Sequence, residues 1–191
     1  MIIKKSDLQK CNIENFIKEN RESLQGSALF TRNSSLISKI VCHACQGKCE
    51  VKGEHFIPSH IASIYEDVGE DGNVELYLLD IKPPISTRQK LIDYLNSSKD
   101  DFVIFERFFP IDIRQFNNYM KKRVGLIYGL LSAVQSIFKN FTIKHGMHCS
   151  ENYIYAYNQQ GFMFDIDANK STPDSLLHYL INTEYKLNEK S

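Results

Sequence analysis

One cysteine in this sequence lies where a thiol can act as a nucleophile. Cys149 is followed directly by Ser150 and Glu151, at the expected start of a helix that Gly161 ends. The unpaired backbone N–H groups and the positive end of the helix dipole favour the thiolate, which is the nucleophilic form. The same N–H groups can hold an oxyanion that develops on an attacked carbonyl. The alternative interpretation of Cys149 is a buried, inert cysteine.

A partner base for the thiol is expected on a β-hairpin. Two apolar runs, residues 59–65 and 74–80, flank a Gly-Glu-Asp-Gly turn signal. If the chain folds back at this turn, a residue of the first strand lies opposite a residue of the second strand when their two numbers sum to about 141. This register puts His60 beside Asp80 or Ile81. A neighbouring carboxylate fixes the tautomer of an imidazole and supports it as a base. A surface ion pair is the alternative.

The rest of the pattern predicts an α+β fold, with an antiparallel sheet packed against helices, that positions these residues. Strands are expected over residues 28–30 and 102–105 and helices over residues 7–24, 34–44, 87–97 and 112–139. The helical region up to residue 139 is expected to supply core side chains, among them Leu126 and Ile127.

Composition excludes several classes of protein. The chain has 191 residues and 42% hydrophobic residues, which suits one globular domain. Lys plus Arg and Asp plus Glu are both 23, so the formal net charge is zero and gives no electrostatic reason to expect binding to nucleic acid. The most apolar stretch, residues 124–138, is too short to cross a bilayer. A polar start without a secretory signal and an odd count of five Cys predict a cytoplasmic protein with free thiols.

Short motifs occur in a characteristic order along the chain. They cover residues 26–32, 35–40, 59–62, 78–80, 102–107, 125–129, 149–151 and 172–176. Their order and spacing resemble the circularly permuted papain-like hydrolases of the NlpC-type superfamily, relatives of which are the YiiX-like proteins and lecithin retinol acyltransferase. The resemblance implies a single catalytic domain over residues 26–191, with residues 1–25 as an N-terminal helix packed on it. In ordinary papain-like proteins the catalytic cysteine comes before the histidine in the chain, and the circular permutation explains why His60 here precedes Cys149.

The resemblance also implies a function. In this interpretation Cys149 is expected to be the nucleophile, His60 the base and Asp80 the residue that orients the base, in a cysteine hydrolase that cleaves an amide, peptide, ester or thioester through an acyl-enzyme. No cofactor is implied. The expected substrates are peptides, peptidoglycan or acylated molecules, and a peptidoglycan role would require lysis, a dedicated secretion system or a phage particle. An acyltransferase and an inactive binding module with the same fold are the alternatives.

A cysteine cluster offers a metal site as another interpretation. Cys42, Cys45 and Cys49, with His43 or His55 nearby, have some of the spacing of a zinc or iron–sulfur site. Free thiols are favoured over metal, because the first two cysteines continue an amphipathic helix and no second Cys-x-x-Cys exists.

A kinase-like phosphotransferase is a distant further alternative. His145, Asn152 and Asp165 are similar to a kinase catalytic loop and its metal-binding aspartate, with residues 153–157 as a strand. Met147 stands where such a loop needs a carboxylate to receive the substrate proton, which argues against this function.

The neighbours of Cys149 are expected to be structural. His148 is interpreted as a solvated or core-edge histidine that could tune the adjacent thiol. Glu151 is expected to stabilise the helix start as a first-turn acid. The tyrosines at 153, 155 and 157 are expected to pack in the core.

Overall fold

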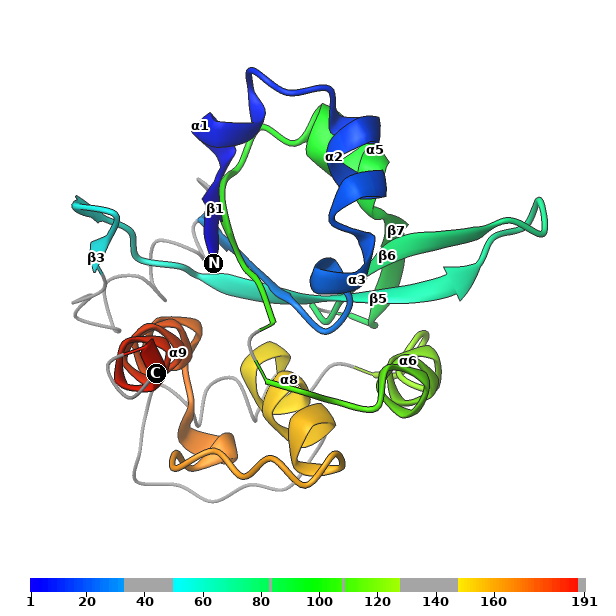
Figure 1. Ribbon diagram of the computed structural model, residues 1–191. Helices are drawn as coiled ribbons and strands as arrows, with labels where there is room; N and C mark the ends of the chain where they lie inside the picture. The colour runs from blue at the N-terminus through cyan, green and yellow to red at the C-terminus, as the bar shows by residue number, and fades with distance from the viewer. Residues whose placement is uncertain (33–49, 83, 108, 128–147, 189–191) are drawn as a thin grey trace.

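A computed structural model describes residues 1–32, 50–82, 84–107, 109–127 and 148–188. Within these ranges the chain forms a six-stranded sheet of order β1-β8-β2-β5-β6-β7, in which all neighbours are antiparallel (Figure 1). The strands are β1 Ile2–Lys4, β2 Ala28–Arg32, β5 His60–Val68, β6 Val74–Asp80, β7 Thr87–Lys90 and β8 Asp101–Phe105, with a separate hairpin of β3 Glu50–Val51 and β4 Glu54–His55.

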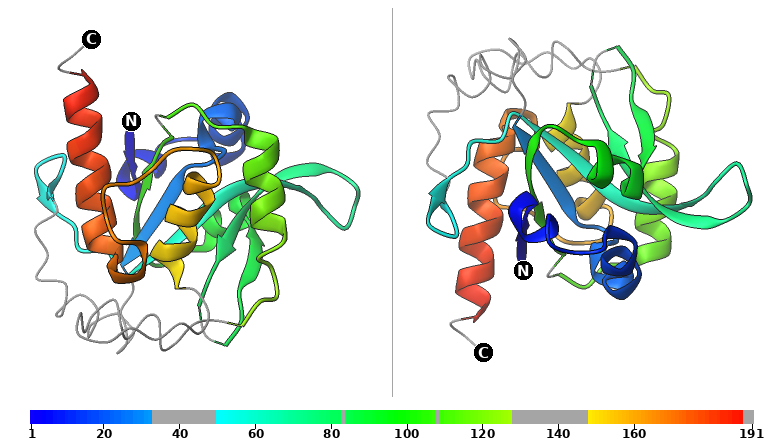
Figure 2. Two further views of the ribbon diagram at one scale, coloured as in Figure 1. Left: turned by 90° about the horizontal axis from the view of Figure 1, so that it is seen from below. Right: turned by 90° about the horizontal axis from the view of Figure 1, so that it is seen from above.

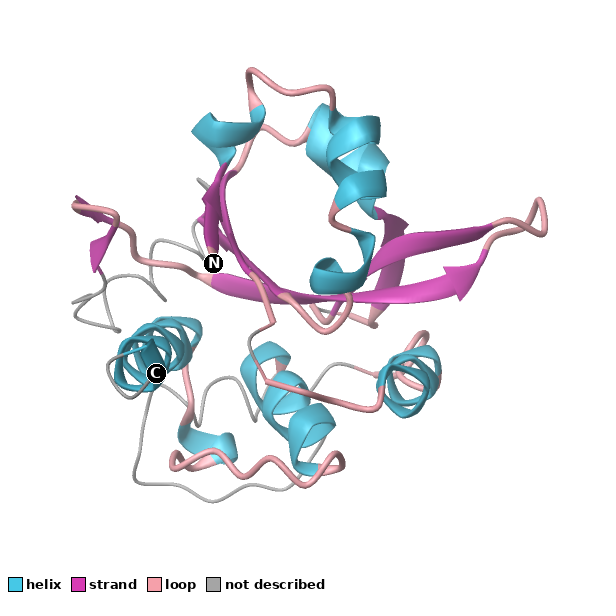
Figure 3. Cartoon of the chain, viewed as in Figure 1, coloured by secondary structure: helices cyan, strands magenta, loops and turns pink. Residues whose placement is uncertain are grey.

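Helices cover both faces of the sheet, so the architecture is α+β, as expected (Figure 3). One face carries α1 Lys5–Leu8, α2 Ile13–Glu19, α3 Arg21–Leu24 and α5 Leu91–Ser97. The other carries α6 Ile113–Lys121, α8 Cys149–Asn158, the short 3-10 helix Ala168–Lys170 and α9 Pro173–Asn188. In both perpendicular views α8 lies between α6 and α9 (Figure 2). None of the helices in the described ranges is long and apolar enough to span a membrane.

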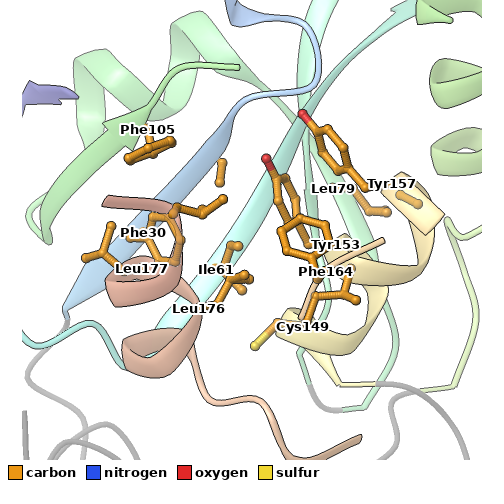
Figure 4. Packing of buried hydrophobic residues seen from close by; sticks show 14 of the residues in the cluster. Phe30, Ile61, Leu79, Phe105, Cys149, Tyr153, Tyr157, Phe164, Leu176 and Leu177 are labelled. Carbon is orange, nitrogen blue, oxygen red and sulfur yellow. The ribbon is translucent and has the colours of Figure 1, made fainter. Parts of the chain in front are cut away.

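Two cores form because successive side chains of a strand point to opposite faces of the sheet. Ile61 and Leu79 belong to the core under α6, α8 and α9, whereas their neighbours Ala62 and Leu78 belong to the core under α3 and α5. The core under α8 is the one that contains Cys149 (Figure 4). The strands that carry His60 and Asp80 are therefore held by apolar packing on both faces.

The β5–β6 hairpin forms as expected, but its register differs by one residue. Asp80 pairs with Ala62, so His60 is the diagonal neighbour of Asp80 and not the residue opposite it. The cause is a longer turn: Val68 pairs with Val74, and the N–H of Gly69 donates to the carbonyl of residue 73. Diagonal neighbours on one face remain within reach of long side chains, so the expected contact survives the shift.

The single helix expected over residues 7–24 is wrong. The first residues form the edge strand β1, and three short helices follow it. The Asn12 side chain accepts a bond from the N–H of Asn15 and starts α2 anew, while the Asn20 side chain donates to the carbonyl of Phe16 at its end. Asparagine competes with helices through such local bonds, which is why the run breaks at these positions.

Two other expected helices are shorter than predicted. Residues 87–90 pair with β6 as strand β7, so only Leu91–Ser97 is helical in that segment. Helix α6 ends at Lys121, because the chain beyond it is held to Ser86 by backbone hydrogen bonds. Leu126 and Ile127 are consequently 46% and 80% exposed, which corrects their assignment to the core. The helix expected over residues 34–44 and the segment 128–139 lie outside the described residues.

We expect Gly26→Ala to lower the free energy of unfolding by about 2–4 kcal/mol. Gly26 has a φ of +82°, and an added Cβ would lie 2.7 Å from Ile111 Cδ1, so the change adds overpacking to backbone strain. Gly53→Ala is the matched control, because Gly53 has a φ of +79° and no heavy atom of the described residues lies within 4 Å of an added Cβ, and it should lose only about 1 kcal/mol. Urea unfolding measures both, and equal losses would contradict the expectation.

Candidate active site

Helix α8 begins at Cys149, as the sequence predicts, and a reciprocal cap sets that start. His148 is the N-cap residue: its Nδ1 accepts from the N–H of Glu151 at 3.3 Å, and Glu151 Oε2 accepts from the N–H of His148 at 3.3 Å. Each bond satisfies a donor that a helix end would otherwise leave unpaired. The structural role expected for Glu151 is confirmed.

Two tyrosines hold α8 against the sheet. The hydroxyls of Tyr153 and Tyr157 donate to the carbonyl of Gly26 at 3.0 and 2.6 Å, and both side chains are buried (Figure 4). Tyr155 is partly buried against the same core. The expected packing of the three tyrosines is confirmed, and it anchors the helix whose first residue is Cys149.

His60 and Asp80 meet at the end of the hairpin. His60 is the first residue of β5 and Asp80 the last of β6, and His60 Nε2 lies 2.7 Å from Asp80 Oδ1. Burial raises the pKa of Asp80, but the hydrogen bonds and charges of His60 and Lys82 lower it to about 2. The carboxylate is therefore ionised over the physiological range and can orient the imidazole. Lys82, a second partner of Asp80, was not anticipated from the sequence.

The thiol of Cys149 faces His60. Burial raises the pKa of this thiol, but the positive charge of His60 and the adjacent His148 lower it overall. Burial likewise lowers the pKa of His60, but the charge of Cys149 and the hydrogen bond of Asp80 raise it overall. Because Nε2 of His60 is engaged by Asp80, Nδ1 is the ring nitrogen left for the sulfur. The arrangement favours a thiolate beside an imidazolium.

The three side chains expected from the sequence thus come together from three separate elements. Backbone donors lie beside them, because the N–H groups of Cys149 and Ser150 are in the first turn of α8 and have no acceptor within the helix. This set can supply a nucleophile, a proton carrier, an orienting carboxylate and donors for an oxyanion.

His148 is the residue that sequence reasoning placed least well. Its side chain is only 2% exposed, whereas a solvated or core-edge histidine was expected. The available signal was the glutamate three residues after it, since that spacing is typical of a capping box. Histidine is not among the common N-cap residues, so the pattern is easily missed.

The metal interpretation receives no support from the part of the chain that the structure describes. His55 lies exposed in the β3–β4 hairpin, and no cluster of His, Cys, Asp and Glu suited to a metal occurs among the described residues. Cys42, Cys45, Cys49 and His43 lie outside them.

The kinase-like alternative fails on secondary structure. Residues 153–157, its expected strand, are helical in α8. The side chain of Asn152 is buried with its Nδ2 3.7 Å from Met120 Sδ, while Asp165 is exposed. His145 and Met147 lie outside the described residues.

Comparison with known proteins adds no relative. No family model matches the chain, and no match was found among curated proteins or among solved structures. The functional argument therefore depends on the residues and geometry of this chain.

Proposed function

We propose that this protein is a cysteine hydrolase that cleaves an amide, peptide, ester or thioester bond through an acyl-enzyme on Cys149. The observation that carries the proposal is the 2.7 Å contact between His60 Nε2 and Asp80 Oδ1, beside a buried thiol at the N-terminus of a ten-residue helix. An antiparallel sheet with the cysteine helix packed on it, and the chain order of His60 before Cys149, also support a circularly permuted papain-like fold of the NlpC type.

In the first half of the reaction the thiolate of Cys149 attacks the substrate carbonyl carbon. The carbonyl electrons move to oxygen, and the N–H groups at the start of α8 stabilise that oxyanion. As the intermediate collapses, the scissile bond breaks and the imidazolium of His60 gives its proton to the leaving amine, alcohol or thiol. The product is a thioester on Cys149 and a neutral His60.

In the second half a water molecule attacks the thioester. Neutral His60 accepts a proton from this water, and Asp80 stabilises the imidazolium that results. Breaking the carbon–sulfur bond releases the acid and restores the thiolate. An alcohol or amine in place of water would give an acyltransferase at the same site, and measuring the second product distinguishes the two activities.

An inactive binding module with this fold is a weaker proposal. Such a module needs neither an acidified thiol nor a histidine oriented by a carboxylate, yet Cys149, His60 and Asp80 all carry those properties. A protein that only binds its partner has no need of these three side chains in this arrangement, so their presence together favours the enzyme.

Alkylation of the cysteines across pH tests the proposal first. Iodoacetamide labelling of the full chain, with mass spectrometry to locate the modified residue, should show Cys149 reacting at a pH well below the pKa of a free thiol, about 8.5. Exposed Cys11, labelled in the same sample, is the internal control. The chain is then incubated with p-nitrophenyl esters and peptide aminomethylcoumarins, where a mass increase equal to the acyl group is expected on Cys149. Ordinary titration of Cys149 would refute the proposal.

Turnover is expected to follow a bell-shaped pH profile with a broad plateau. The rate should rise with pH as the thiol of Cys149 ionises, and it should do so below the pKa of a free thiol because the pKa of Cys149 is lowered. The rate should fall again as the imidazolium of His60 loses its proton, at a pH above about 6.5, because the pKa of His60 is raised. Asp80→Asn removes a negative charge that raises the pKa of His60, so the alkaline limb should move to lower pH and the rate should fall. An alkaline limb that does not move would show that Asp80 does not act through His60.

A further inference from the structure

A buried ring nitrogen of His148 lies at the start of α8 without a conventional partner. Its Nδ1 accepts from the N–H of Glu151, so the hydrogen-bond pattern assigns the ring proton to Nε2. This Nε2 is buried and has no hydrogen-bond partner within the described part of the chain. Glu151 Oε2, at 3.9 Å, is beyond hydrogen-bond distance. An unmatched buried donor is costly, so a negative charge that forms within reach of this N–H is stabilised.

Cys149 is the group that can become such an acceptor. It follows His148 directly and becomes an anion when its thiol ionises, and His148 is among the groups that lower the pKa of Cys149. Among the described residues, the other charged groups near the sulfur are those of His60 on β5, Asp80 and Lys82 beside His60, and Glu151 beside His148. Helix α9 contributes apolar Leu176 to this core.

We propose that His148 is a positioning residue whose Nε2–H donates to the thiolate of Cys149, so that the sulfur is held between two imidazoles with different tasks. This inference rests on the proposed function. His60 carries the proton that is transferred, whereas His148, with Nδ1 engaged in the helix cap, acts only as a donor. It stabilises the thiolate in the resting enzyme, and again when that thiolate leaves the acyl-enzyme, because a better stabilised thiolate is a better leaving group.

The test is His148→Asn, which keeps a good N-cap and removes the imidazole. At pH 4, below the wild-type pKa of Cys149 of about 5, we expect iodoacetamide alkylation of Cys149 to slow by up to about tenfold relative to the wild type, the effect of losing one charge-assisted hydrogen bond. At pH 10 the rate should be equal or higher, because a less stabilised thiolate is more nucleophilic. The matched control is His55→Asn, the same change at an exposed histidine, which should follow the wild-type curve.

The outcomes separate this inference from the proposed function. An ordinary thiol pKa for Cys149 in the wild type overturns the proposed function itself. A low pKa in the wild type that rises in His60→Ala but stays unchanged in His148→Asn overturns the role of His148 alone. A rate reduced equally at pH 4 and pH 10 also overturns it, since that is the pattern of a merely structural defect.

A second measurement needs only the wild type and applies if His148→Asn does not fold. The nitrogen-15 shifts of the His148 ring, measured by NMR above the pKa of Cys149, should show a protonated Nε2 and an unprotonated Nδ1. The Nε2–H signal should move when iodoacetamide converts Cys149 to a neutral thioether. A proton on Nδ1, or an Nε2–H signal that does not respond to alkylation, would overturn the inference.

Discussion

Cys149→Ala is expected to abolish turnover, with a loss of about 10⁴-fold or more for an amide substrate. The substitution removes the atom that forms the covalent intermediate, so the residual rate comes only from binding and oxyanion stabilisation. The side chain is 8% exposed and its loss removes one sulfur from the core, so the fold should persist. Hydrolysis of a p-nitrophenyl ester and of a peptide aminomethylcoumarin measures the effect, with circular dichroism to confirm folding.

A matched variant controls for the loss of a cysteine as such. Cys11→Ala removes an exposed thiol that packs in no core, and it should keep wild-type activity. Intact-mass spectrometry should find the acyl-enzyme in Cys11→Ala and not in Cys149→Ala. Turnover that survives in a folded Cys149→Ala protein would refute covalent catalysis at this residue.

His60→Ala is expected to lower turnover by about 10²- to 10⁴-fold, the range that general acid–base groups contribute. Two effects combine: the leaving group loses its proton donor, and the thiol loses the positive charge that lowers the pKa of Cys149. The pH at which Cys149 becomes reactive toward iodoacetamide should therefore rise in the same variant. His55→Ala, at the exposed histidine of β4, is the control and should change neither property.

The two readouts of His60→Ala test different parts of the argument. Slow turnover with an unchanged pKa of Cys149 would leave His60 as a proton carrier but would assign the acidity of the thiol to the helix start and His148. An unchanged rate of turnover would remove His60 from the mechanism. The combined variant His60→Ala with Asp80→Asn should be little worse than His60→Ala, because Asp80 acts on the reaction through the imidazole.

Much of the candidate site could be predicted from sequence because its signals are local. The start of α8 at Cys149 depends on residues within one helical turn, and strand β6 was predicted with its observed bounds, Val74–Asp80. The proximity of His60 to Asp80 follows from a hairpin, in which the turn alone brings the strands together. Where the signal was local but ambiguous, as at the asparagines that divide the N-terminal segment, the prediction of one continuous helix was wrong.

The sequence by itself determined which residues could do chemistry: the thiol at a helix start, and the histidine and aspartate on one hairpin. Only the tertiary structure decided that these two elements meet, because contact between β5 and α8 joins segments about ninety residues apart through packing that no local pattern encodes. It also decided that Asp80 is a diagonal partner of His60, that residues 87–90 become an edge strand, and that His148 is buried. The burial of a side chain and the register of a strand depend on contacts with segments distant in the sequence, and these contacts exist only in the folded protein.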